Sequence, residues 1–141
     1  MRIFDSGRLY VAQPDGWMAF CGTDSGGQIT PKKVHIYKGI LCRTDIFTHA
    51  GITVCFFGKE DYYLSPKRFY ENIVDMKPIV LGAYTWNRYT CTSLNYPYTM
   101  LDTEKDGYII QVMILMKNGE YVISLEDSDV RCIIESLTVI N

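Results

Sequence analysis

One stretch of the chain, from Tyr108 to Leu125, limits the fold more than any other. It reads YIIQVMILM, then KNGE, then YVISL, so two apolar segments flank a short turn. That turn contains Asn118-Gly119, the strongest short hairpin signal, because both residues tolerate positive φ. Gln111 is the one strongly polar side chain of the first segment, which is therefore apolar on both faces. We predict that this segment is a strand at the centre of a sheet that is covered on both sides.

Other strand-like segments recur along the chain without regular alternation with helices. They are Arg8–Gln13, Trp17–Cys21, Val34–Tyr37, Ile52–Phe57, Ile79–Tyr84 and an edge strand at Thr138–Ile140. Pro14-Asp15-Gly16 has turn chemistry, so residues 8–21 are predicted to form a hairpin. The polar stretches at 22–30 and 102–107 are predicted to be a loop and a turn.

Two segments have helical signals. In Ser65–Val74, Ser65 can cap the first turn and Pro66 suits the first helical position. An apolar stripe then follows on one face, formed by Phe69, Ile73 and Met76. A second, short helix is predicted within Val130–Leu137.

Either Ser128 or Asp129 is expected to cap the second helix. The resulting fold class is α+β, a mostly antiparallel sheet with one or two helices packed on it. At 141 residues the chain is expected to form one domain, spanning residues 1–141.

Bulk properties exclude several kinds of partner. The net charge is −2 and the pI about 5.6, whereas nucleic-acid binding normally needs clustered Lys and Arg, so no nucleic-acid partner is expected. No apolar run approaches the roughly 20 residues that span a bilayer. Charges at Arg2, Asp5 and Arg8 interrupt any signal-peptide core, so we expect a cytoplasmic protein with no membrane partner.

Motifs for metals, cofactors or nucleophilic catalysis are missing. The five cysteines include no CxxC pair, so free thiols in a reducing compartment are expected. The carboxylates of residues 102–107 lack the rest of a calcium loop. We therefore expect no cofactor, no metal site and no enzymatic activity.

A small metal-independent ribonuclease is the alternative that the residues leave open. Such an enzyme can work with two histidines that transfer protons and a lysine that stabilises the phosphate. The chain has two histidines, His35 and His49, and several nearby lysines, which are Lys32, Lys33, Lys38 and Lys59. This reading requires the two imidazoles and one lysine to converge in a single cleft.

The surface interpretation relies on aromatic and acidic residues. Tyr and Trp are enriched at protein-binding hot spots, and acidic groups would steer a basic partner. The predicted partner-binding residues are Glu60, Asp61, Trp86, Tyr89, Tyr96, Tyr98, Asp102, Glu104, Asp106, Glu126, Asp127 and Asp129. The loop-like Tyr96-Pro97-Tyr98 is expected to be exposed, whereas Tyr84 and Trp86 share a strand face and could instead pack the core.

Three segments resemble the immunity proteins of bacterial contact-dependent growth inhibition and related polymorphic toxin systems. They are the SPKRFYENI segment, the PIVLGAY strand and the closing SLEDSDV segment. The resemblance implies a small cytoplasmic α+β protein that binds a cognate toxin domain, often a nuclease, and blocks its active site. An acidic patch would then imitate the phosphates that the toxin binds.

The working hypothesis is a non-enzymatic immunity protein that binds a basic surface of a toxin domain. The ribonuclease is its enzymatic alternative. A third hypothesis is a subunit whose partner is another copy of itself.

Overall fold

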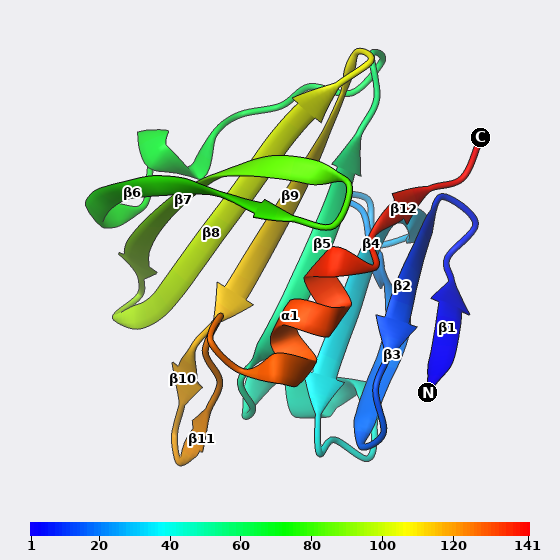
Figure 1. The fold of residues 1–141 in the computed structure, drawn as a ribbon. Coiled ribbons are helices and arrows are strands. Elements are labelled where there is room, and N and C mark those ends of the chain that lie inside the picture. The colour runs from blue at the N-terminus through cyan, green and yellow to red at the C-terminus, as the bar shows by residue number, and fades with distance from the viewer.

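The structure, a computed structural model, describes residues 1–141. Strands predominate, and helices are few and short (Figure 1). The strands are β1 (Arg2–Asp5), β2 (Leu9–Gln13), β3 (Trp17–Thr23), β4 (Ile29–Lys38), β5 (Gly51–Phe57), β6 (Glu71–Leu81), β7 (Tyr84–Ser93), β8 (Tyr96–Lys105), β9 (Tyr108–Leu115), β10 (Lys117–Asn118), β11 (Tyr121–Val122) and β12 (Thr138–Val139). The helices are the 3-10 helices η1 (Arg43–Phe47) and η2 (Pro66–Arg68) and the α-helix α1 (Ser128–Glu135).

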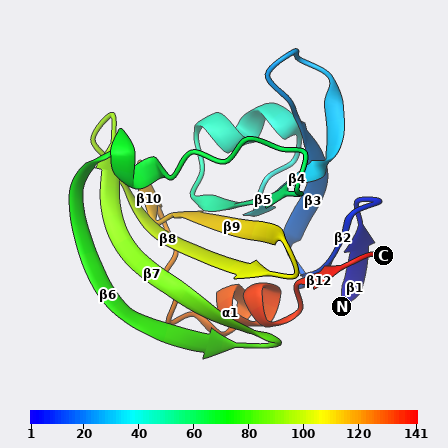
Figure 2. The same ribbon diagram turned by 90° about the horizontal axis from the view of Figure 1, so that it is seen from above.

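A seven-stranded antiparallel sheet dominates the molecule, in the order β3-β4-β5-β9-β8-β7-β6. Two meanders, β3–β5 and β6–β9, are joined where β5 pairs with β9. The sheet is strongly curved, and its β6–β7 end bends round the side that holds α1 (Figure 2). The predicted antiparallel sheet is confirmed, but a single short α-helix makes α+β only a loose description.

The central position predicted for the Tyr108 segment is confirmed, since β9 is the fourth strand of seven. The hairpin predicted after it is only partly correct. A turn forms one residue later than predicted, at Gly119-Glu120, where Gly119 has φ +61°, while Asn118 lies in β10 and pairs with Tyr121. However, β11 pairs with β10 in a separate two-stranded ribbon and not with β9. Both edges of β9 are already occupied by β5 and β8, so no edge remains for a returning strand.

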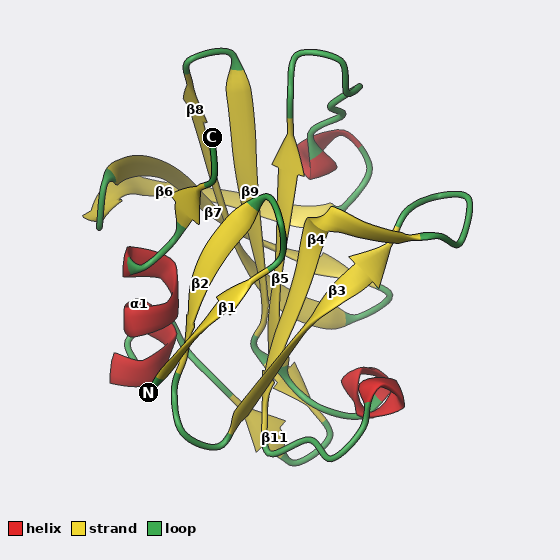
Figure 3. Ribbon diagram, turned by 90° about the vertical axis from the view of Figure 1, so that its right-hand side faces the viewer, coloured by secondary structure: helices red, strands yellow, loops and turns green.

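The hairpin predicted over residues 8–21 is wrong in its pairing. The turn at Pro14 forms, and the N–H of Trp17 donates to the Pro14 carbonyl at 3.0 Å. Strand β2, however, pairs with β1 and with β12 in a separate three-stranded sheet beside α1 (Figure 3). The pairing with β12 confirms the edge strand that was predicted at the C-terminal end.

The helix predicted over Ser65–Val74 is wrong beyond its first turn. Ser65 caps η2, accepting a hydrogen bond from the N–H of Lys67, but strand β6 begins at Glu71. Val74 and Val80 of β6 pair with β7, and β-branched residues favour strands. Pro78 is tolerated there because β6 is the edge strand of the sheet.

Two tight turns replace segments that were predicted to be irregular. Leu94 and Asn95 both have positive φ, as do Asp106 and Gly107, which is typical of two-residue type I′ hairpins. Strand β8 therefore fills all of the chain between these turns. The loop predicted at residues 96–98 and most of the turn predicted at 102–107 are strand instead.

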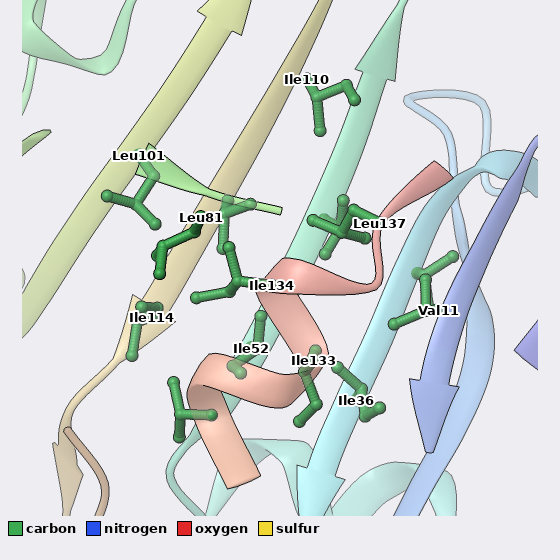
Figure 4. Close-up of a cluster of buried hydrophobic side chains, with 14 of the residues drawn as sticks. Val11, Ile36, Ile52, Leu81, Leu101, Ile110, Ile114, Ile133, Ile134 and Leu137 are labelled. Carbon is green, nitrogen blue, oxygen red and sulfur yellow. The ribbon is translucent and has the colours of Figure 1, made fainter. Parts of the chain in front are cut away.

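Helix α1 covers the concave face of the sheet. The main hydrophobic core lies between the helix and the sheet. Val130, Ile133 and Ile134 are buried on its inner side. Figure 4 shows Ile133 and Ile134 among side chains from the sheet, including Ile52 and Ile114. The capping prediction is wrong by one residue, because Asp127 is the N-cap and both Ser128 and Asp129 lie inside the helix.

Candidate functional site

The sheet has a second face that α1 does not cover. Directly opposed residues of an antiparallel pair point to the same face. His35 is opposite Thr53, Thr53 is opposite Met113, and Cys55 is opposite Gln111. Their sequence neighbours on these strands belong to the core beneath α1. These five side chains therefore lie on the other side, which we call the outer face.

Two connecting segments cover parts of the outer face. Residues 39–50, which contain η1, and residues 58–70, which contain η2, both lie on the side of the sheet away from α1 (Figure 2). The first segment packs on this face through Ile40 and Ile46. The second packs through Tyr70. Between and beside them the face remains open.

A groove with a volume of about 620 Å³ lies on the outer face, beside the 58–70 segment. Strands β5 and β9 supply its floor, and β4 and the β3–β4 turn form the side that faces the segment. Volumes of this size are typical of ligand-binding clefts. Half of its 16 lining residues are hydrophobic and most of the others are polar or charged; the lining includes Asp24, Ser25, Thr30, Lys32, Lys33, Cys55, Phe57, Asp61, Tyr62, Leu64, Phe69, Tyr70, Gln111 and Met113.

Gln111 is the polar group most strongly constrained in this groove. Only 7% of the residue is exposed, and its side-chain Oε1 has no hydrogen-bond partner. Leaving a buried acceptor unpaired costs roughly 1–3 kcal/mol, and this oxygen lies beneath the accessible surface of the groove. The signal was visible in the sequence as the lone amide of an otherwise apolar central strand.

Two lysines line the groove, and they differ in whether their charge is already paired within the protein. Lys32 pairs with Glu60 at 3.1 Å and with Asp61 at 2.9 Å. Lys33 forms no ion pair and lies against Gly22, where a Cβ would come within 2.6 Å of the Lys33 side chain. Burial raises the pKa of the Cys55 thiol, and the Lys33 charge partly offsets this effect. Lys33 is therefore the unneutralised cation beside the groove.

A second hollow of about 320 Å³ lies on the outer face between η1 and the β7–β8 turn. It is mainly apolar, and Phe47, Leu94, Tyr96 and Tyr98 contribute to its lining. Phe47 is 75% exposed and Leu94 is 86% exposed. Exposed aromatic and aliphatic side chains thus continue along this face beyond the groove.

The aromatic residues predicted to bind a partner divide into two groups. Trp86 is fully buried in the core, and Tyr89 is 1% exposed. Neither is available to a partner, so this part of the prediction is wrong. Trp86 packs in the core, which is the alternative role given above for the strand face that it shares with Tyr84. Tyr89 lies beneath the 58–70 segment. Tyr96 and Tyr98 do lie on the outer face, although in strand β8 and not in a loop.

The acidic residues predicted to bind a partner do not form one surface. Glu60 and Asp61 lie near the groove but are paired with Lys32. Asp102 accepts a hydrogen bond from the Asn87 amide at 3.0 Å. Glu104 is exposed near the end of β8, and Asp106 lies in the β8–β9 turn.

The remaining predicted acids, Glu126, Asp127 and Asp129, lie at the start of α1, on the opposite side of the sheet. Glu126 pairs with Arg131, and the N-cap Asp127 accepts the N–H of Ser124. Asp129 accepts the indole N–H of Trp17 at 3.1 Å and pairs with Lys38. Burial opposes its ionisation, but the Trp17 and Lys38 contacts keep the pKa of Asp129 below its usual value. These three acids therefore lie on the α1 side of the sheet, whereas Asp102, which is opposite Gln111, lies on the outer face.

The two histidines occupy different parts of the structure. His35 is in the middle of β4, and its Nδ1 lies 2.8 Å from the Thr53 hydroxyl. His49 precedes β5 and stacks on Tyr121, with ring centroids 3.9 Å apart. None of the described cavities is lined by both imidazoles, so none of them is the shared cleft that the ribonuclease alternative requires.

We expect His35 to make stability depend on pH. Burial, together with the nearby Lys33 charge, lowers its pKa to about 4, whereas an unfolded histidine titrates near about 6.5. Between these values the unfolded chain binds a proton that the folded chain does not, so stability falls as the pH falls. After allowing for solvent screening of a partly exposed group, the loss should be about 1–2 kcal/mol.

Urea denaturation at pH 7 and pH 5 measures this effect. His35→Gln should reduce the dependence on pH, while the matched variant His49→Gln should retain it. The same pH dependence in both variants would show that His35 is not responsible.

No group of three or more His, Cys, Asp or Glu side chains is placed to hold a metal ion. The helices are too short and insufficiently apolar to span a bilayer.

Comparison with known proteins assigns no family to this chain. No family model matches the chain, and no curated protein matches it. Among solved structures it is similar to LpqN, which is described as involved in cell envelope biogenesis of Mycobacterium tuberculosis. The identity is 10%, the match covers 94% of this chain and 83% of the LpqN chain, and the TM-score is 0.47.

Proposed function

We propose that this protein is a non-enzymatic binding protein that holds a protein partner on its outer face. The observation that carries the proposal is the concentration of exposed apolar side chains on the segments around that face. Leu41 is 90% exposed, Tyr62 is 83% exposed and Phe69 is 56% exposed. Exposed apolar patches of this kind mark interaction sites on soluble proteins.

A protein partner suits this surface better than a small ligand does. A ligand within the groove would contact its floor and walls but would leave Phe47 and Leu94, which line the second hollow, in water. A protein could cover both hollows and their rims together. Buried aromatic anchors surrounded by groups that exclude water are the usual source of affinity in such interfaces.

The groove also indicates what the partner should present. An apolar side chain of the partner would fit against Met113 and Tyr70. An acidic group on the partner would complement Lys33. We propose, from the sequence resemblance, that the partner is a toxin domain and that the chain is its immunity protein. The scattered acidic residues give no support to phosphate mimicry.

Affinity capture from the producing strain tests the proposal. The double variant Phe47→Ser/Tyr62→Ser removes two exposed side chains of the outer face. The matched variant Ile3→Ser/Val80→Ser removes two exposed side chains that line neither hollow. We expect wild type and the matched variant to retain the same protein, and the outer-face variant to bind it about tenfold or more weakly, as measured by calorimetry.

The class of partner is tested separately. The captured protein, expressed alone, should inhibit growth, and co-expression of the wild-type chain should restore it. A captured protein that is harmless would reject the immunity role while leaving the binding site intact. Equal capture by all variants, or no capture at all, would reject the outer face as the binding site.

A further inference from the structure

A third cavity lies away from the outer-face hollows and has a different chemical character. Its volume is about 540 Å³. It lies where five separate parts of the chain meet, namely Arg8 before β2, the end of β5, the β6–β7 turn, the β8–β9 turn and residues 138–141. The side chains that matter in it are Arg8, Lys59, Lys105, Tyr84 and Tyr108.

The cavity collects positive charge in a chain whose net charge is −2. Arg8, Lys59 and Lys105 all line it, and none of them takes part in an ion pair. Asp106 is the one acidic side chain in the lining. Three unpaired cations around one hollow favour a negatively charged occupant.

Arg8 is held in place but lacks acceptors. Its guanidinium lies over the Phe56 ring, 5.1 Å from the centroid, and its Nε is buried without a hydrogen-bond partner. The Asp61 carboxylate, which feels the Arg8 charge, is already bound by Lys32 and by the N–H of Gly58. The buried Nε is out of reach of an occupant, but an oxyanion in the cavity would accept from the terminal N–H groups of Arg8, which have no acceptor within the protein.

The two lysines and two tyrosines complete the set of donors. Lys105 lies over the Tyr84 ring at 5.5 Å, and Lys59 lies against Gly107, where a Cβ would approach it within 2.4 Å. The hydroxyls of Tyr84 and Tyr108 are 3.0 Å apart. One hydrogen bond joins these hydroxyls, so one O–H remains free to donate to a ligand.

From this geometry we infer that the cavity binds a small polyvalent phosphate. A phosphate carries close to two negative charges and several acceptor oxygens near neutral pH. It therefore matches a guanidinium fork, two ammonium groups and a phenol better than a single carboxylate does. The site is independent of the outer face and does not depend on the protein-binding proposal.

Calorimetric titration of the full chain with inorganic pyrophosphate tests the inference. The variant Lys59→Gln/Lys105→Gln removes two cations of the cavity. The matched variant Lys77→Gln/Lys117→Gln removes two exposed lysines elsewhere, so both variants have the same net charge. We expect wild type and the matched variant to bind pyrophosphate, and the cavity variant to bind it about tenfold or more weakly. Both changed lysines in each variant are exposed, so each variant should fold.

Three results would overturn the inference. They are no binding of pyrophosphate by wild type, the same affinity for the two variants, and binding of citrate as tight as that of pyrophosphate. The second result would show that general surface charge is responsible. The third would show that the cavity selects charge and not phosphate.

Discussion

Replacing Trp86 by alanine should lower the free energy of unfolding by about 3–5 kcal/mol. The side chain is completely buried in the main core, and its Nε1 donates a hydrogen bond to the Leu81 carbonyl at 3.1 Å. Its ring also packs against Tyr84, with centroids 5.5 Å apart. Small domains are stable by only about 5–15 kcal/mol, so the variant should be close to unfolding at ambient temperature.

Urea denaturation measures the loss at Trp86, and Thr85→Ala is the matched control. Thr85 is an exposed neighbour on the same strand, so its replacement should change stability by less than about 0.5 kcal/mol. A Trp86→Ala variant that stays stable but no longer binds the protein partner would contradict the core role and support the partner-binding role predicted from the sequence.

Replacing Gly82 by alanine should cost about 2–5 kcal/mol, for two reasons that add together. The backbone of Gly82 has φ +65°, which is unfavourable for residues with a Cβ. In addition, a Cβ there would lie 2.2 Å from the carbonyl oxygen of Glu135, at the end of α1. That oxygen is backbone and cannot move aside without shifting the helix.

Gly119→Ala separates the two contributions in the same denaturation experiment. Gly119 has a similar φ of +61°, but a Cβ there would meet nothing within 4 Å. Its replacement should therefore show only the cost of the backbone conformation, about 1–2 kcal/mol. Equal losses at the two glycines would mean that the contact between the β6–β7 turn and α1 contributes nothing.

Features that depend on local sequence were predicted well from the sequence. The apolar run around Val112 placed β9 at the centre of the sheet, and the Asn118-Gly119 signal marked a turn that forms one residue later, at Gly119-Glu120. The segment after Ser65 was misread because its local apolar stripe fits a helix, whereas pairing with β7 determines the structure. That pairing joins residues as distant as Glu71 and Thr92, and no local pattern reports it.

The candidate site was harder to predict, because burial depends on parts of the chain that are distant in sequence. Tyr89 points to the outer face, but Lys67 of the 58–70 segment lies over its ring at 5.0 Å. The prediction that Tyr89 anchors an interface was based on its residue type alone. Gln111 was visible as an unusual amide, yet its unpaired oxygen becomes meaningful only once β5, β9 and the 58–70 segment form a groove around it.

The pairing of β5 with β9 makes the folding of the two meanders interdependent. Neither meander can bury its apolar side alone, because the helix that covers both of them follows the last long strand. The two halves should therefore gain stability together, in one cooperative transition. Gly51 and Leu115, which are 64 residues apart in the sequence, must pair, and such distant pairings slow folding. A nascent chain would expose the apolar side of β3–β5 until its C-terminal residues had been synthesised.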